Sequence, residues 1–317
     1  MQQIVDVILP VFGLIAVGWL TSRIRLLGDD VGDALGNFVF TIAVPLLIFR
    51  TLATADFAGS SPWPLWIAYF TGAGVSWGLA IAIIRLGFGR DARAGVIAGV
   101  SSSFSNLVLV GTPLVMTAFG EKGLVPVFLV VSVQLPVMMT VSTLLIEQAE
   151  RRERAASQGP GGASLAATLL RNIFTSPIIL GILAGALWRT TGLAIPGPMK
   201  SLVDGLAATA IPCALFSLGM GLKRYGIAGN IGPAFLLTAL KLLVMPAVVW
   251  LVVSRFPGVP PMWVKVLTIG AATPTGVNAY LLAVRFRTGH GLASNTITLS
   301  TALAVVTVTL WLHFVEG

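Results

Sequence analysis

Apolar segments long enough to cross a bilayer follow one another along almost the whole chain. A membrane-spanning α-helix needs about 20 consecutive, mostly apolar residues. Cutting the sequence at charges and at proline and glycine clusters gives ten such segments, at residues 3–22, 34–54, 63–87, 94–118, 123–147, 168–188, 199–221, 232–254, 263–286 and 291–315. We therefore expect an all-α integral membrane protein with ten transmembrane helices.

Composition supports this class and argues against others. Of the 317 residues, 56% are hydrophobic and 10% are charged, whereas soluble domains carry about 25% charged residues. The net charge of +8 then indicates basic cytoplasmic loops rather than nucleic-acid binding. One cysteine and two histidines, Cys213, His290 and His313, do not suggest a metal site, and we expect no cofactor.

Basic residues divide unequally between the two sets of alternate loops and helix ends. The richer set holds Arg23, Arg25, Arg85, Arg90, Arg93, Arg151, Arg152, Arg154, Arg171, Lys223, Arg224, Arg285 and Arg287. The poorer set holds Arg50, Lys122, Arg189, Lys200, Arg255 and Lys265. Because basic residues accumulate in cytoplasmic loops, the richer set is predicted to face the cytoplasm. We expect a multi-pass protein of the cell (inner) membrane with both termini outside.

The two halves of the chain share a spacing of prolines and glycines. Three pairs are 167 positions apart, namely Pro10 with Pro177, Gly18 with Gly185, and Pro45 with Pro212. This spacing predicts a first repeat at 1–147, a cytoplasmic linker at 148–167 and a second repeat at 168–317. Because each repeat holds an odd number of helices, the second must enter the membrane inverted, as in inverted-repeat transporters.

Two expected helices are interrupted by polar residues. The first interruption spans Ser101–Pro113, and the second spans Ala272–Asn278. Proline lacks an N–H and clashes with the preceding turn, so we expect the first helix to break near Gly111–Pro113. A broken helix at membrane depth is tolerated where it lines a cavity or lies buried in protein. Two breaks at matching places in two halves indicate a transporter's binding site.

The segment Asn106–Leu114 resembles the Asn…Gly-x-Pro-Leu segment of the auxin efflux carrier family. That family includes the plant PIN-formed auxin exporters and bacterial proteins described as malonate or malate permeases. Further similar landmarks are Leu9–Phe12 with Gly18 and Trp19, Asn37–Phe40 with Pro45, and Thr273–Tyr280. Like bacterial members, this chain lacks the long central cytoplasmic domain of the plant proteins.

The resemblance implies a fold similar to the bile acid sodium symporters. The first, second, sixth and seventh helices would form a scaffold. Helices three to five and eight to ten would form a transport domain, in which helices four and nine cross at their breaks. The resemblance also implies a homodimer through the scaffold helices.

Helix starts and polar side chains at the interruptions suit a carboxylate. The N-terminal end of a half-helix beginning at Pro113 or Pro274 carries partial positive charge, which favours an anion. Amide groups come from Asn106, Asn278 and Gln134, and hydroxyls come from Ser103, Ser105, Thr112, Thr273 and Thr275. The alternative for each is hydrogen bonding between membrane helices without a substrate role.

Lys241 is expected near the middle of a transmembrane helix with no neighbouring acid. An intramembrane lysine indicates a functional site by default, and here it could neutralise a substrate carboxylate. Two alternatives are a side chain that reaches the membrane surface and a bond to carbonyls freed at a helix break. Apart from Glu147 at the last position of a span, only Asp6 and Asp204 among the acids fall within expected spans, and Asp204 can pair with Lys200 one turn away. A carboxylate proton relay is therefore not predicted, while sodium coupling remains open.

The sequence thus predicts a secondary transporter that moves small organic anions, such as auxin-like or dicarboxylic acids, by alternating access. Its partners would be that anion, the lipid bilayer and a second copy of the chain. One alternative is a sodium-coupled symporter of the bile acid type. A membrane-embedded enzyme and a channel are further alternatives, although the chain shows no His/Glu metal motif and no paired intramembrane carboxylates.

Overall fold

The structure is a computed structural model that describes residues 2–54, 61–155, 176–225 and 231–316. Its regular elements in these ranges are all helical. The α-helices are α1 (Gln2–Arg23), α2 (Asp29–Phe38), α3 (Val44–Ala53), α4 (Trp63–Ala82), α5 (Ala92–Ser103), α6 (Thr112–Phe119), α7 (Leu124–Ala155), α9 (Pro177–Thr190), α10 (Gly197–Ala208), α11 (Ala210–Tyr225), α12 (Gly232–Ala239), α13 (Met245–Val253), α14 (Pro261–Ala271), α15 (Asn278–Arg285) and α16 (His290–Glu316). Short turns are η1 (Val39–Ala43), η2 (Ile83–Gly87), η3 (Leu107–Gly111), η4 (Glu121–Gly123) and η5 (Leu240–Val244).

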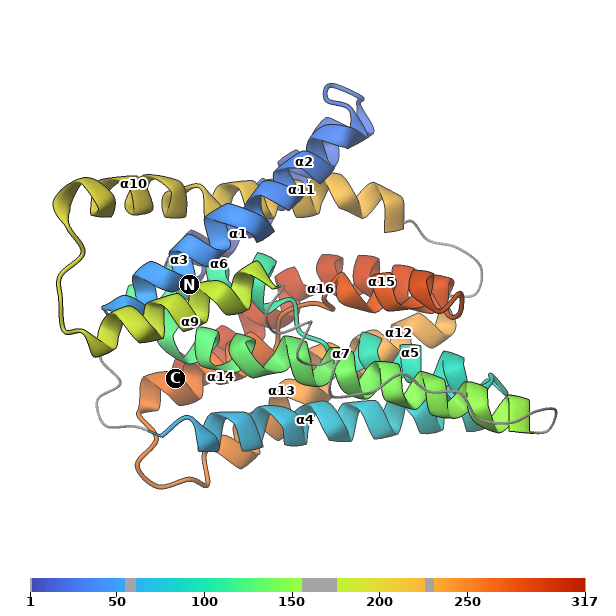
Figure 1. Ribbon diagram of the computed structural model, residues 1–317. Helices are drawn as coiled ribbons and strands as arrows, with labels where there is room; N and C mark the ends of the chain where they lie inside the picture. The colour runs from blue at the N-terminus through green and yellow to red at the C-terminus, as the bar shows by residue number, and fades with distance from the viewer. Residues whose placement is uncertain (1, 55–60, 156–175, 226–230, 317) are drawn as a thin grey trace.

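The expectation of an integral membrane protein is confirmed. Seven helical segments are long and apolar enough to cross a membrane, at 6–23, 30–53, 63–87, 121–149, 197–223, 232–253 and 290–316. Each overlaps one of the expected spans. The other three expected spans contain shorter helices, because 94–118 and 263–286 are interrupted and 168–175 lies outside the described residues. Both chain ends lie at one end of the molecule, and the C-terminal end of α7 lies at the other (Figure 1).

The first interruption lies earlier than expected. The prediction of a break near Gly111–Pro113 is wrong, because α5 ends at Ser103 and helical structure resumes at Leu107. The π-helical turn η3 leads directly into α6, and Pro113 lies in the first turn of α6. Two other π-helical turns, η1 and η5, also end two residues before a proline, Pro45 and Pro246. A π-helical turn is a known place for helices to absorb an irregularity without breaking.

An asparagine cap marks the actual restart of the first helix. The Oδ1 of Asn106 accepts a 3.3 Å hydrogen bond from the Leu109 N–H, and the Asn106 carbonyl accepts from the N–H groups of Val110 and Gly111. Asparagine is a preferred residue at such positions because its side chain satisfies a free N–H. The second break falls where expected, between the end of α14 at Ala271 and the start of α15 at Asn278.

A shared contact relates the two halves. A Cβ added to Gly18 in α1 would lie 2.2 Å from the carbonyl oxygen of Phe216 in α11. A Cβ added to Gly185 in α9 would lie 2.9 Å from the carbonyl oxygen of Phe49 in α3. Both the glycines and the phenylalanines are 167 positions apart, which is the spacing seen in the sequence. In each pair, glycine allows the close approach of two helix backbones.

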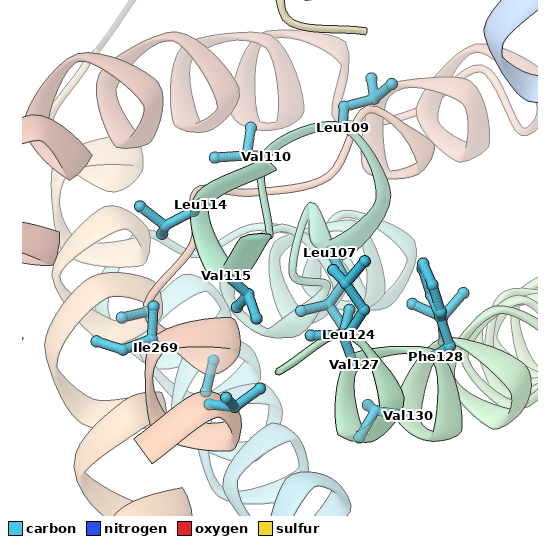
Figure 2. Packing of buried hydrophobic residues seen from close by; sticks show 14 of the residues in the cluster. Leu107, Leu109, Val110, Leu114, Val115, Leu124, Val127, Phe128, Val130 and Ile269 are labelled. Atoms are coloured by element: carbon cyan, nitrogen blue, oxygen red, sulfur yellow. The ribbon is translucent and has the colours of Figure 1, made fainter. Parts of the chain in front are cut away.

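The half-helix after the first break is fixed by a buried apolar cluster. Figure 2 shows side chains of η3 and α6 gathered with those of α7 and with Ile269 of α14. Leu107, Leu114 and Leu124 are all at most 3% exposed.

Helix α7 also continues to Ala155, past the expected end at residue 147, so the first residues of the expected linker are helical. The rest of that linker lies outside the described residues.

Candidate binding site at the two helix breaks

The two breaks lie against each other and exchange backbone hydrogen bonds. The Asn106 N–H donates to the Pro274 carbonyl at 2.9 Å, and the Gly276 N–H donates to the Phe104 carbonyl at 2.8 Å. Ser105 and Thr275 thereby form an isolated antiparallel bridge. Backbone groups that each helix gives up at its break are in this way satisfied by the other break, which membrane depth requires.

Most of the expected hydroxyl groups bind protein carbonyls. Thr275 Oγ1 donates to the Ser101 carbonyl at 2.6 Å, which ties the second break to α5. The hydroxyls of Ser103, Thr112 and Thr273 donate to carbonyls within their own segments, at 2.7, 3.0 and 2.8 Å. All four side chains are buried. The structure therefore places these residues, with Pro113 and Pro274, in the framework around the breaks.

The Lys241 side chain ends inside the second break. Its Nζ donates 2.6 Å hydrogen bonds to the carbonyls of Ala271 and Thr273, and the whole residue is 0% exposed. Carbonyls at the C-terminal end of α14 have no intrahelical partner and carry partial negative charge. The ammonium neutralises this helix end and does not extend toward a membrane surface. Of the alternatives given for Lys241, the structure therefore shows the bond to carbonyls freed at a helix break.

A cavity of about 300 Å³ lies beside the joined breaks. It is lined by Phe40, Thr41, Phe104, Ser105, Asn106, Leu107, Val108, Val131, Gln134, Leu135, Ser176, Pro177, Ile178, Gly276, Val277, Asn278 and Leu281. Four of the expected site residues belong to this lining, namely Ser105, Asn106, Gln134 and Asn278. The other expected residues, including Lys241, do not. None of the described residues that line the cavity has a charged side chain.

Asn106 lines this cavity and holds a buried hydrogen-bond donor that no protein group uses. Its Oδ1 is taken by the Leu109 N–H, which fixes the orientation of the amide. The Nδ2 is buried and has no partner, which in a native structure calls for an explanation such as a ligand or water. The helical segment that begins at Leu107 and the helix that begins at Asn278 both start at the cavity wall. The positive dipole ends of these two helix starts favour an anion there.

Gln134 has an unused hydrogen-bond acceptor, whereas Asn106 has an unused donor. Its Nε2 donates to the Ser105 carbonyl at 2.8 Å and to the Tyr69 hydroxyl at 2.7 Å. A backbone carbonyl can only accept, so the atom facing Ser105 must be Nε2. The Oε1 is then left as an acceptor on a residue that lines the cavity.

The sequence did not predict the mostly apolar part of the lining that comes from η1, α7 and α9. Phe40 and Thr41 come from η1, Ile178 comes from the first turn of α9, and Val131 and Leu135 come from α7. Their residue types are those of any membrane helix, so the sequence offered no signal that they face a cavity. A second cavity of about 210 Å³ shares Phe40 and Val277 with the first one.

Two interrupted helices that meet beside a cavity inside a polytopic helical protein are typical of membrane transporters. A family model described as membrane transport protein matches residues 3–312, so the chain belongs to this family. This result confirms the resemblance to the auxin efflux carrier family, and it indicates a transporter rather than an enzyme.

Relatives of similar length carry transporter names. The "Putative malonate transporter" of Rhizobium meliloti (strain 1021) is 29% identical over 329 aligned positions, which cover 100% of this chain and 97% of the relative. An "Uncharacterized transporter" of Methanothermobacter thermautotrophicus is 26% identical, with 96% of each chain covered. The mouse "Lysosomal cholesterol signaling protein" is 24% identical over 75% of this chain, which corresponds to 28% of that longer protein.

Proposed function

We propose that this protein is a secondary transporter of small organic anions that carry one carboxylate on a largely apolar body. The observation that carries the proposal is the buried, unpartnered Nδ2 of Asn106 beside two helix N-termini at the 300 Å³ cavity. These groups are neutral donors and partial charges, which suit one carboxylate. A second carboxylate would enter a mostly apolar site without a cationic partner, and burying an unpaired charge is costly.

Lys241 supports transport without sodium. Carbonyl oxygens at a broken helix are the type of ligand that a sodium ion uses in transporters. Here the carbonyls of Ala271 and Thr273 are already bonded to the Lys241 ammonium. The lysine thus occupies carbonyl oxygens with which a symporter of the bile acid type could bind a cation. Replacing sodium with potassium or choline in an uptake assay separates the two functions, because only the symporter stops.

Alternating access is supported by the relation between the two halves. The contacts Gly18–Phe216 and Gly185–Phe49 share one spacing, as expected for two five-helix repeats of inverted orientation. In this architecture α1–α3 and α9–α11 form the scaffold, and the remaining helices form the moving transport domain. The cavity is lined by Phe40 and Ile178 from the first group and by the two breaks from the second. The proposal includes dimerisation through the scaffold, the inner membrane, and both termini outside.

A channel is the competing transport mechanism. A carrier that closes around its substrate shows saturation of flux and counterflow of labelled substrate, whereas an open pore shows neither. Measuring both in proteoliposomes distinguishes the two mechanisms once a substrate is known.

The first experiment is a binding screen on purified protein by thermal shift. Monocarboxylates with apolar bodies are expected to raise the melting temperature more than short dicarboxylates such as malonate. Losing a hydrogen bond to a charged group costs about 1.5–3 kcal/mol, so Asn106→Ala should weaken binding roughly tenfold to a hundredfold. Ser103→Ala is the matched control, because Ser103 bonds Gly99 and does not line the cavity. Equal affinity in both variants would contradict the assignment of Asn106.

A further inference from the structure

An ion-pair network occupies the opposite end of the helix that lines the site. Arg50 in α3 places one guanidinium nitrogen 3.0 Å from Glu121 and the other 3.5 Å from Asp204. Asp204 also accepts a 2.5 Å bond from Lys200 one turn away in α10. The network borders a second large cavity of about 710 Å³. This pairing goes beyond the Lys200–Asp204 contact that the sequence suggested.

The network joins the two bodies of the proposed transporter. Arg50 and Asp204 lie on α3 and α10, in the scaffold, whereas Glu121 lies in η4, between α6 and α7 of the transport domain. The Arg50 guanidinium therefore pairs with Asp204 within the scaffold and with Glu121 in the transport domain. Movement of the transport domain away from the scaffold would break the bond to Glu121 and leave Arg50 paired with Asp204.

The network and the candidate site face opposite ends of the molecule. Arg50 is ten residues beyond Phe40 along α2–α3, which corresponds to about 15 Å. On the other side, the 210 Å³ cavity extends from Phe40 past Asn37 and Asp33, toward the end that the basic loops assign to the cytoplasm. In the present conformation the two cavities, which share Phe40 and Val277, thus lie toward that end, while the Arg50–Glu121 pair joins the two bodies at the other.

We propose that the Arg50–Glu121 pair is a latch that stabilises the cytoplasm-facing conformation. This inference rests on the proposed function, because it needs two conformations. The Glu121 side chain is 67% exposed and the Arg50 side chain is 20% exposed, so the pair is screened by water. A pair of this kind shifts an equilibrium by roughly two- to fivefold. The latch is thus strong enough to bias the conformations and weak enough to open in each transport cycle.

Cysteine reporters at the two cavities test the latch without a substrate. In a Cys213→Ser background, Thr41→Cys reports on the 300 Å³ cavity and Thr51→Cys reports on the 710 Å³ cavity. Glu121→Gln is expected to slow maleimide labelling at Thr41→Cys and to accelerate it at Thr51→Cys, each by roughly two- to fivefold. Glu121→Asp retains the charge and should behave as the parent protein.

Lys122→Gln is the matched control, because Lys122 borders the same cavity but has no ion pair in the described structure. Parent labelling rates in Glu121→Gln, or an equal change in Lys122→Gln, would overturn the latch. Adding a carboxylate that raises the melting temperature tests the transport mechanism separately. If such a ligand changes the two labelling rates in opposite directions while Glu121→Gln does not, alternating access stands and the latch fails.

Discussion

The Nζ of Lys241 lies 2.6 Å from the carbonyl oxygen of Thr273, inside the break that follows α14. A second bond of the same length joins it to Ala271. The lysine thus acts as a tethered cation that satisfies a helix C-terminus. Its position also keeps the positive charge off the cavity lining. These contacts favour a structural role for Lys241 over direct pairing with a substrate.

Lys241→Met should therefore destabilise the protein more than it weakens ligand binding. Each buried carbonyl left without a donor costs about 1–3 kcal/mol. The melting temperature in detergent should fall clearly, while the folded fraction retains its affinity for carboxylates. Lys265→Met is the control, since Lys265 lies near the start of α14 and its side chain has no hydrogen bond or ion pair among the described residues. Loss of binding with an unchanged melting temperature would instead support direct charge pairing.

Alanine at Gly18 should be more harmful than alanine at Gly185. The added Cβ meets a backbone carbonyl at 2.2 Å in the first case and at 2.9 Å in the second. Backbone cannot move aside as a side chain can, and overpacking typically costs about 1–3 kcal/mol. Gly74→Ala is the control, because nothing lies within 4 Å of the position that its added methyl group would take. Thermal unfolding of the three variants checks the order, and equal melting temperatures would contradict it.

The sequence predicted the helical spans well and the site only in part. Length and apolarity alone located α4 with η2 at residues 63–87, because a span needs about 20 apolar residues whatever it packs against. The first break lies before Leu107 and not at the expected proline, because the Asn106 cap sets where the helix restarts. A π-helical turn absorbs Pro113, and its formation depends on hydrogen bonds that no residue pattern displays.

Partners brought together from distant segments could not be predicted. Lys241 and Thr273 are separated by 32 positions, and Gln134 and Tyr69 by 65. These hydrogen bonds decide which polar atoms of Gln134 and Lys241 remain available to a ligand. The sequence indicated that these polar groups lie at membrane depth, but only the fold shows that Lys241 is occupied by carbonyls.

The basic-residue pattern makes a topological prediction. Cysteines introduced at Gln2 and at Ser157, each in a Cys213→Ser background, should differ in their reaction with an impermeant maleimide in intact cells. The first should react, because the N-terminus is expected outside, and the second should react only after the membrane is permeabilised. The reverse result would invert the assigned orientation, including the end at which Arg50 lies.

Gln134 should select ligands that carry a hydrogen-bond donor beside the carboxylate. Its Nε2 is held by Ser105 and Tyr69, which leaves Oε1 as an acceptor. A typical hydrogen bond contributes about 0.5–1.5 kcal/mol, or roughly two- to tenfold in affinity. An acid with a hydroxyl or N–H group should therefore bind more tightly than its counterpart without one. In Gln134→Met the two acids should bind alike, and a preserved preference would place the acceptor elsewhere.

Asn106→Asp separates the two roles of the asparagine. An aspartate oxygen can still accept from the Leu109 N–H, so the cap and the restart of the helix are preserved. The unpartnered Nδ2, however, is replaced by an oxygen, and a carboxylate ligand then meets a like charge where it had met a donor. We expect the melting temperature to fall, because the buried carboxylate lacks a cationic partner, and we expect a loss of carboxylate binding larger than that of Asn106→Ala. Isothermal titration of both variants measures the difference. If Asn106→Asp binds as well as the parent protein, Asn106 caps the helix without touching the substrate.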